Sequence, residues 1–129
     1  MSDNHETIFA KKPLFHFQRL IVYEKAREHH LKIAEFIRSN SVPHHMKDQW
    51  LRASLSIVLN IAEGYGRSGR KEKFRFYNIA RSSVFECVAL VDLLLSMENI
   101  NLTFAEDLIL CSDELSRMLN AMCKNRLAT

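Results

Sequence analysis

The sequence predicts an all-α protein, an antiparallel up-and-down four-helix bundle. Three observations support this fold class. Apolar residues recur at spacings of three, four and seven over long segments, as in amphipathic helices. Short turns containing Asn, Gly or Pro separate these segments, and no stretch has a convincing strand pattern. The length of 129 residues fits one domain with a sizeable core, and 47% of the residues are hydrophobic.

The first two helices are predicted from their apolar periodicity and from the turn between them. The first helix should cover residues 18–39, with its apolar face formed by Leu20, Tyr23, Ala26, Ile33 and Ile37. A turn at Asn40 and Ser41 follows, and Pro43 is well placed to start the second helix because its missing N–H is not needed there. The second helix should cover residues 44–63.

The last two helices are predicted from the signals at their ends. Gly64, Gly66 and Gly69 should end the second helix, because glycine adopts the left-handed conformation at little steric cost. The third helix should cover residues 70–98. A T-x-x-E capping box of Thr103 and Glu106 should start the fourth, which reaches about residue 125. We expect residues 1–14 to be a flexible tail, residues 15–126 the bundle and residues 127–129 a C-terminal tail.

The second helix has a wider apolar face than one bundle requires. On a helical wheel it is apolar or small over roughly 200°, whereas a helix of a lone bundle needs a narrower stripe. Its polar stripe is narrow and consists of Arg52, Ser56, Asn60 and Glu63. Phe74 and Phe85 add apolar surface to the polar side of the third helix. We therefore expect a homo-oligomer.

The charge distribution indicates an anionic partner. Residues 1–81 carry 15 Lys and Arg against 8 Asp and Glu, whereas residues 82–129 carry 3 against 7. We expect phosphate contacts from the basic residues near the glycine turn and from one on the second helix: Arg67, Arg70, Lys71, Lys73, Arg75, Arg81 and Arg52. Phe74 and Phe85 could stack on bases or form subunit contacts. A solvated basic face without a partner is the alternative.

The glycines spell GYGRSG, which fits the G-x-G-x-x-G fingerprint of dinucleotide-binding loops. That fingerprint must leave a strand and open a helix within a βαβ unit, but here it follows a predicted helix. We therefore expect no nucleotide cofactor. A helix N-terminus beside Arg67, Arg70 and Lys71 is nevertheless a plausible place for a phosphate group.

Other chemical sites are not expected. No Glu-x-x-His pair offers a di-metal ligand set, and His30 is expected on the buried side of its helix. Cys87, Cys111 and Cys123 lie among apolar residues without a histidine at helical spacing, which is typical of reduced core thiols in a cytoplasmic protein. Glu63 should pair with Arg52 or Arg67, and Glu86 with an arginine. No apolar run is long enough to span a membrane, and no signal peptide is recognisable.

The stretch SIVLNIAEGYGR, residues 56–67, resembles the signature of the bacterial four-helix-bundle family encoded in intervening sequences of 23S rRNA genes, the S23-like proteins. The matching positions are Ser56, Ile57, Asn60, Ile61, Ala62, Glu63, Gly64, Gly66 and Arg67. The resemblance extends over residues 15–124. It assigns a structural role to Ser56, Asn60, Glu63, Gly64 and Gly66, and it implies a homopentameric barrel.

The same fold is used by the accessory variability proteins of diversity-generating retroelements, which bind nucleic acid and a reverse transcriptase. The resemblance thus implies a non-enzymatic, oligomeric accessory protein that binds RNA or DNA with a basic belt, with a reverse transcriptase as a candidate partner. The alternative is a protein–protein scaffold with no direct role in nucleic-acid binding. Neither function requires a catalytic residue, a metal or a cofactor.

Overall fold

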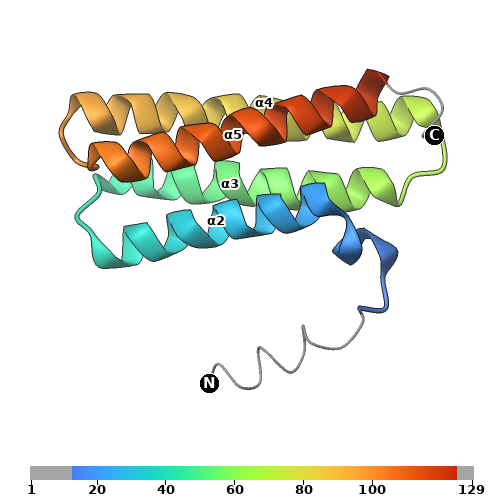
Figure 1. Cartoon of the computed structure of the whole chain (residues 1–129), viewed down its shortest axis with the longest axis horizontal. Helices are drawn as coiled ribbons and strands as arrows, with labels where there is room; N and C mark the ends of the chain where they lie inside the picture. Colours follow the sequence, from blue (N-terminus) through green and yellow to red (C-terminus); the bar gives the residue numbers. More distant parts are fainter. Residues whose placement is uncertain (1–12, 125–129) are drawn as a thin grey trace.

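A computed structural model of the chain describes residues 13–124, and this part contains helices and turns but no strand. A short 3-10 helix, η1 (His16–Arg19), precedes four long helices: α2 (Ile21–Ser39), α3 (His44–Tyr65), α4 (Arg70–Ser96) and α5 (Leu102–Lys124). The four long helices run alternately up and down, side by side (Figure 1). The all-α prediction is confirmed, with four long helices at the positions expected.

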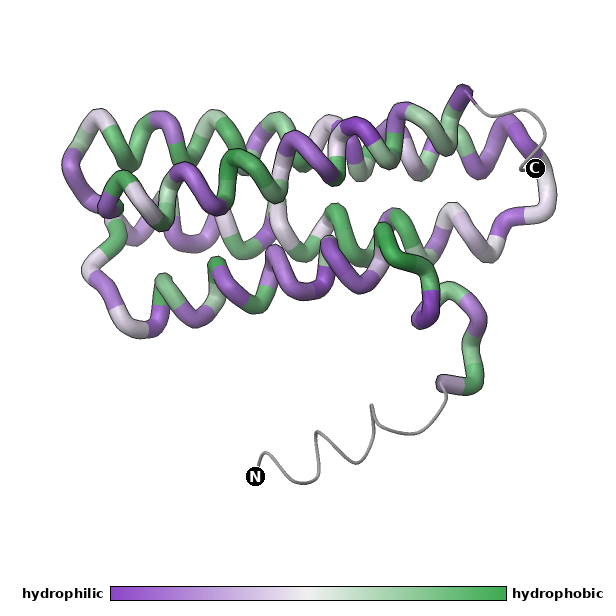
Figure 2. Tube along the Cα trace, in the orientation of Figure 1, coloured by the Kyte–Doolittle hydropathy of each residue, from purple (hydrophilic) through white to green (hydrophobic). Residues whose placement is uncertain are grey.

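The helices pack in chain order around one core. Contacts between α3 and α4 and between α4 and α5 are the most extensive, while α2 and α5 meet along the loosest seam. Hydrophobic and hydrophilic residues alternate along every helix, so each helix is amphipathic (Figure 2). The largest fully buried side chains come from all four helices and include Trp50, Ile33, Ile57, Leu94, Leu108, Leu115 and Leu119.

Several details at the helix ends differ from the sequence predictions. The backbone N–H of Phe104 donates to Asn101 Oδ1 at 2.8 Å, so Asn101 and not Thr103 caps α5. Asparagine is among the best N-capping residues and comes first in the chain, so the helix already begins at Leu102. The third helix ends at Ser96, two residues earlier than predicted.

The left-handed conformation occurs at Glu98 and not at a glycine. Glu98 has φ of 60°, and the N–H of Asn99 donates to the carbonyl of Leu94 at 2.9 Å, which is the Schellman pattern that ends α4. Gly64, Gly66 and Gly69 all have negative φ, so the conformational reason predicted for them is wrong.

The predicted tails lie mostly outside the described residues, and so does the predicted end of the fourth helix at residue 125. Among the described residues, no helix is long and apolar enough to cross a membrane.

Candidate nucleic-acid interface

The hairpin between α3 and α4 is built on a close approach of the two helices at Gly64. A Cβ atom at Gly64 would lie 2.7 Å from Cε1 of Tyr77 and 3.0 Å from Cβ of Phe76, which is closer than carbon atoms can approach. At Gly66 the nearest atom would be 3.6 Å away, and at Gly69 no atom lies within 4 Å. Gly64 is thus needed for packing, and the other two glycines are not.

Lys73 fixes the same hairpin from the first turn of α4. Its ammonium group donates to the carbonyl of Tyr65 at 2.8 Å and to that of Gly64 at 3.4 Å, and it lies 5.2 Å from the Tyr65 ring centroid. Both carbonyls lie at the C-terminal end of α3, where the helix dipole favours a cation, and the Gly64 carbonyl also accepts the N–H of Arg67 at 3.1 Å. Sequence analysis assigned Lys73 to phosphate binding, but this half-buried side chain is engaged as a helix cap.

Four exposed basic residues remain around the turn, and we call them the basic cluster: Arg67, Arg70, Lys71 and Arg75. The guanidinium carbons of Arg67 and Arg75 lie 4.7 Å and 4.6 Å from the ring centroid of Phe76. Because Phe76 itself is buried, it anchors both guanidinium groups at the rim of the bundle. The contact between Arg67 and Phe76 forms only when the hairpin folds, so no local sequence pattern predicts it.

Each of these two arginines also forms a short-range ion pair. Arg67 contacts Glu63 at 2.8 Å, which confirms one of the two partners predicted for Glu63, and Arg75 contacts Glu72 at 3.4 Å. Exposed pairs of this kind contribute about 0–1 kcal/mol. A phosphate group can therefore compete for both guanidinium groups.

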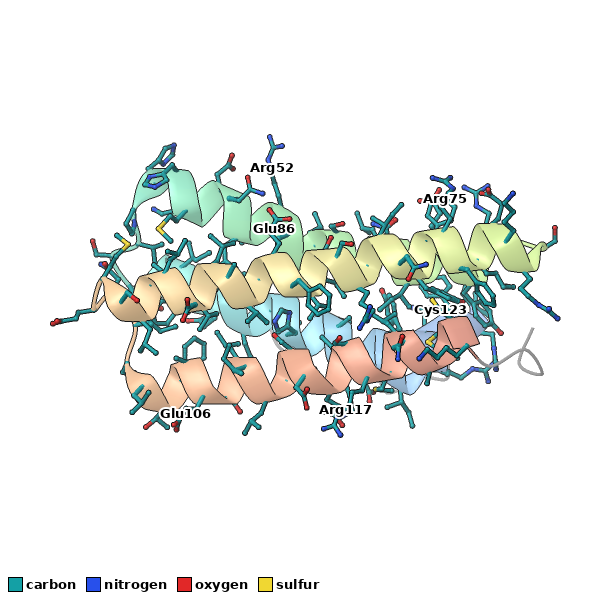
Figure 3. The ribbon with its side chains drawn as sticks, turned by 90° about the horizontal axis from the view of Figure 1, so that it is seen from above. Arg52, Arg75, Glu86, Glu106, Arg117 and Cys123 are labelled. Carbon is teal, nitrogen blue, oxygen red and sulfur yellow. The ribbon has the colours of Figure 1, made fainter. Side chains whose placement is uncertain are left out.

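The other two predicted phosphate contacts lie apart from the basic cluster. Arg52 pairs with Asp48 at 3.6 Å and stands 13 residues before the end of α3, about 20 Å along the helix axis. Figure 3 shows Arg52 and Arg75 well separated along the bundle. Arg81 is half-buried, and its guanidinium carbon lies 4.9 Å from the ring centroid of Phe85.

Ser56 and Asn60 of the signature form a small hydrogen-bond network that reaches from α3 to α4. Asn60 Nδ2 donates to the backbone carbonyl and to the hydroxyl of Ser56, at 2.8 Å and 3.0 Å, and the Ser83 hydroxyl donates to Ser56 Oγ at 2.9 Å. Glu86 accepts a hydrogen bond from Gln49, not from the arginine that was predicted. Ser56 is therefore the residue of this polar stripe that bonds directly to α4, through the Ser83 hydroxyl, while Asn60 bonds to Ser56 within α3.

Charge is segregated along the bundle. The half that holds the α3–α4 turn (residues 13–28, 55–82 and 113–124) carries 11 Lys and Arg against 6 Asp and Glu. The other half (residues 29–54 and 83–112) carries 4 against 7. The basic cluster thus lies at the positive end of a bundle whose opposite end is negative, and polyanions are attracted to one end.

Two serine–histidine pairs link α2 to its neighbours, which the sequence did not indicate. The hydroxyl of Ser54 lies 2.7 Å from His30 Nδ1, and that of Ser112 lies 3.5 Å from His29 Nε2. His30 is partly buried and faces α3, while His29, which the sequence analysis did not single out, is fully buried. Both serines are buried as well, so no substrate carbonyl can reach either hydroxyl group.

The cysteines are poorly suited to nucleophilic attack. Burial raises the pKa of the Cys87 thiol to about 12, and burial also raises the pKa values of Cys111 and Cys123. At neutral pH these groups are thiols and not the reactive thiolates. Within residues 13–124, no three His, Cys, Asp or Glu side chains gather closely enough to hold a metal ion.

A family model described as 23S rRNA-intervening sequence protein matches residues 18–121. The chain belongs to this family. The match covers all four long helices up to the last turn of α5, and it includes the whole α3–α4 hairpin. The family resemblance found in SIVLNIAEGYGR is confirmed. The link to diversity-generating retroelements stays a prediction.

A solved structure has the same fold. It is the crystal structure of a protein of unknown function from the S23 ribosomal protein family of Bacteroides thetaiotaomicron VPI-5482, with a TM-score of 0.73 and 25% sequence identity. The match covers 81% of this chain and 100% of that protein. A search of the curated proteins found no match.

Proposed function

We propose that this protein is a non-enzymatic accessory protein that binds RNA or DNA through phosphate contacts. The observation that carries the proposal is the basic cluster, in which one hairpin presents four exposed cations at the positive end of the bundle. Two of these cations are held in place by Phe76 and form only weak ion pairs. Contacts of this kind neutralise phosphates without reading base sequence.

The bound form is a cytoplasmic, ring-like homo-oligomer, a pentamer by the family resemblance. Large exposed apolar side chains support self-association, among them Leu55 and Leu59 on the outer face of α3. In a ring of parallel subunits the positive ends lie together, so the basic clusters join into a belt. A phosphate backbone following that belt contacts several subunits at once, which raises its affinity.

A reverse transcriptase of a diversity-generating retroelement is the partner that the resemblance suggests. Gene neighbourhood tests this extension, because a reverse transcriptase gene and a template repeat beside this gene support it. Placement inside a 23S rRNA gene supports the other branch of the family. The alternative function, a protein–protein scaffold, requires the exposed apolar side chains but not the basic cluster.

Charge reversal tests the basic cluster. We expect the triple variant Arg70→Glu, Lys71→Glu, Arg75→Glu to lose binding to generic single-stranded RNA, measured by fluorescence anisotropy as a function of salt. The wild-type protein should lose affinity along a steep log–log salt slope, because each neutralised phosphate adds roughly 0.7 to that slope for single strands.

The matched control carries the same charge change at the other end of the bundle: Lys32→Glu, Arg38→Glu and Lys47→Glu. It should retain most of the affinity and keep the salt slope, while circular dichroism shows that both triple variants are folded. If the two triple variants lose affinity equally, net charge and not the basic cluster governs binding. If the wild-type protein binds no RNA or DNA at low salt, the proposed function is wrong and the scaffold function remains as the alternative.

A further inference from the structure

A second set of side chains runs along α4 on the side that faces α5. Lys71, Phe74, Asn78, Arg81 and Phe85 follow at spacings of three, four, three and four, which places them on one face of the helix. The two aromatic residues differ in the folded protein. Phe74 is half-buried beside Cys123, whose thiol contacts its carbonyl at 4.0 Å, whereas 52% of Phe85 is exposed.

Arg81 and Phe85 form a cation–π pair on this face of α4. The guanidinium carbon of Arg81 lies 4.9 Å from the ring centroid of Phe85, within the range of a cation–π contact. Arg81 Nε is buried and has no hydrogen-bond partner among the described residues. The Nε end of this guanidinium group is therefore held by packing, and the positive charge stays beside the exposed Phe85 ring.

A hollow of about 340 Å³ adjoins Phe85 between α4 and α5. Its walls are mainly apolar, with one acid at the rim: Val88, Ala89, Val91, Asp92, Leu95 and Ile109. A planar ring stacked on Phe85 can extend into this hollow and exclude water from an apolar surface. Asn78, about two turns of α4 from Phe85 towards the basic cluster, adds an exposed amide group to the same face.

We infer that Phe85, Arg81 and the adjoining hollow bind an unpaired nucleobase, so the protein prefers single-stranded nucleic acid to duplex. This inference rests on the proposed function, because the basic cluster must bring the phosphate backbone to α4. Bases inside a duplex stack on each other and offer no free face, whereas unpaired bases stack on exposed aromatic and guanidinium planes.

Charge decides between a nucleic acid and a second copy of the chain as the occupant of this face. Lys71 and Arg81 lie on the same stripe as Phe85, and no acidic residue lies on that stripe between Lys71 and Phe85. A protein surface that covered the stripe would have to remove these cations from water, which is costly without an acidic partner. A single strand brings both a phosphate for the cations and a base for the ring.

The test compares one oligonucleotide sequence as single-stranded RNA, single-stranded DNA and duplex. We expect Phe85→Leu to lose roughly tenfold in affinity for the single strands and to leave duplex binding unchanged. Phe85→Tyr keeps an aromatic ring and should bind the single strands like the wild type. Leu93→Ala is the matched control, because Leu93 is on the same helix, 53% exposed, and borders a different hollow, with His45 and Gln49. It should bind like the wild type.

Three results overturn the inference. Equal losses for single strands and duplex in Phe85→Leu, together with a lower oligomer mass, place Phe85 in a subunit interface. Unchanged single-strand affinity in Phe85→Leu, with wild-type binding intact, removes the base contact but leaves the proposed function standing. If the wild-type protein binds none of the three oligonucleotides, the proposed function and the inference fail together.

Discussion

His29 is a polar residue in the centre of the core. It is 1% exposed, lies 3.5 Å from the hydroxyl of Ser112 through Nε2, and has no hydrogen-bond partner for Nδ1 among the described residues. Burial, with smaller effects of His30 and Lys32, lowers the pKa of His29 from 6.5 to about 4. The folded protein therefore holds a neutral imidazole where the unfolded chain holds a proton at mildly acidic pH.

The sign of this shift predicts a loss of stability in acid. As the pH falls below 6.5, the unfolded chain takes up a proton on His29, whereas the folded protein takes it up only near pH 4. The free energy of unfolding therefore decreases as the pH is lowered from 6.5 to 4. At pH 4, the pKa shift of His29 lowers the free energy of unfolding by about 3 kcal/mol. The pKa of His30 is also lowered by burial and acts in the same direction.

His29→Gln should flatten this pH dependence, because glutamine keeps a hydrogen-bonding group and does not titrate. Urea unfolding followed by the fluorescence of Trp50, measured between pH 7 and pH 4, gives the two curves. We expect the wild-type curve to fall more steeply. Parallel curves would mean that folding does not lower the pKa of His29.

At the scale of elements, the close approach of α3 and α4 at Gly64 predicts opposite effects for two neighbouring glycines. Gly64→Ala should destabilise the protein by about 1–3 kcal/mol, because its Cβ would meet Tyr77 at 2.7 Å and push the helices apart. Gly66→Ala should be neutral or stabilise by about 0.5 kcal/mol, since its φ of −78° suits alanine and its nearest contact is 3.6 Å. Thermal unfolding of both variants measures the difference, and equal effects would contradict the packing role of Gly64.

The helices could be predicted from the sequence because the apolar periodicity is repeated over many residues, so one or two exceptions do not change the assignment. Their ends could not be predicted as well, because Thr103 and Asn101 both offer N-cap chemistry and Glu98 adopts a conformation usually left to glycine. The predicted helix boundaries that fall within the described residues are still within a few residues of the observed ones.

The sequence predicted which basic residues group near the turn, but not how their side chains are arranged in the folded protein. The sequence shows that the charges are close in the chain, and the hairpin then assigns them different tasks. Lys73 reaches back to the carbonyls that end α3, and Arg67 reaches across the turn to the Phe76 ring, which Arg75 contacts from within α4. Local patterns carry no information about such contacts.

At the scale of the whole molecule, charge and apolar surface have complementary arrangements. Net positive charge lies at one end of the bundle and net negative charge at the other. Exposed leucines such as Leu55 and Leu59 lie on the side of the bundle, on α3. Side-by-side association through that face can therefore bury apolar surface without burying the basic cluster. The same association brings the positive ends together, which costs electrostatic energy that a bound polyanion removes.

This arrangement predicts that assembly and nucleic-acid affinity are lost together in one variant. Leu59 is 54% exposed on the outer face of α3, and Leu59→Glu introduces a charge that an apolar interface cannot accommodate without a partner. The wild-type protein should have a mass several times the 15.0 kDa of one chain, and the variant should have the mass of one chain. We expect its RNA affinity to fall by at least tenfold, because a monomer contacts the strand with one basic cluster only.

Leu110→Glu is the matched control, since Leu110 is 70% exposed and lies on α5, away from α3 in the bundle. Light scattering gives the masses, anisotropy the affinities, and circular dichroism the helix content, which should be equal in all three proteins. Dissociation of Leu110→Glu with an intact Leu59→Glu assembly would move the interface to α5. A monomeric Leu59→Glu variant with full RNA affinity would mean that one basic cluster is sufficient, because multivalency then adds nothing to binding.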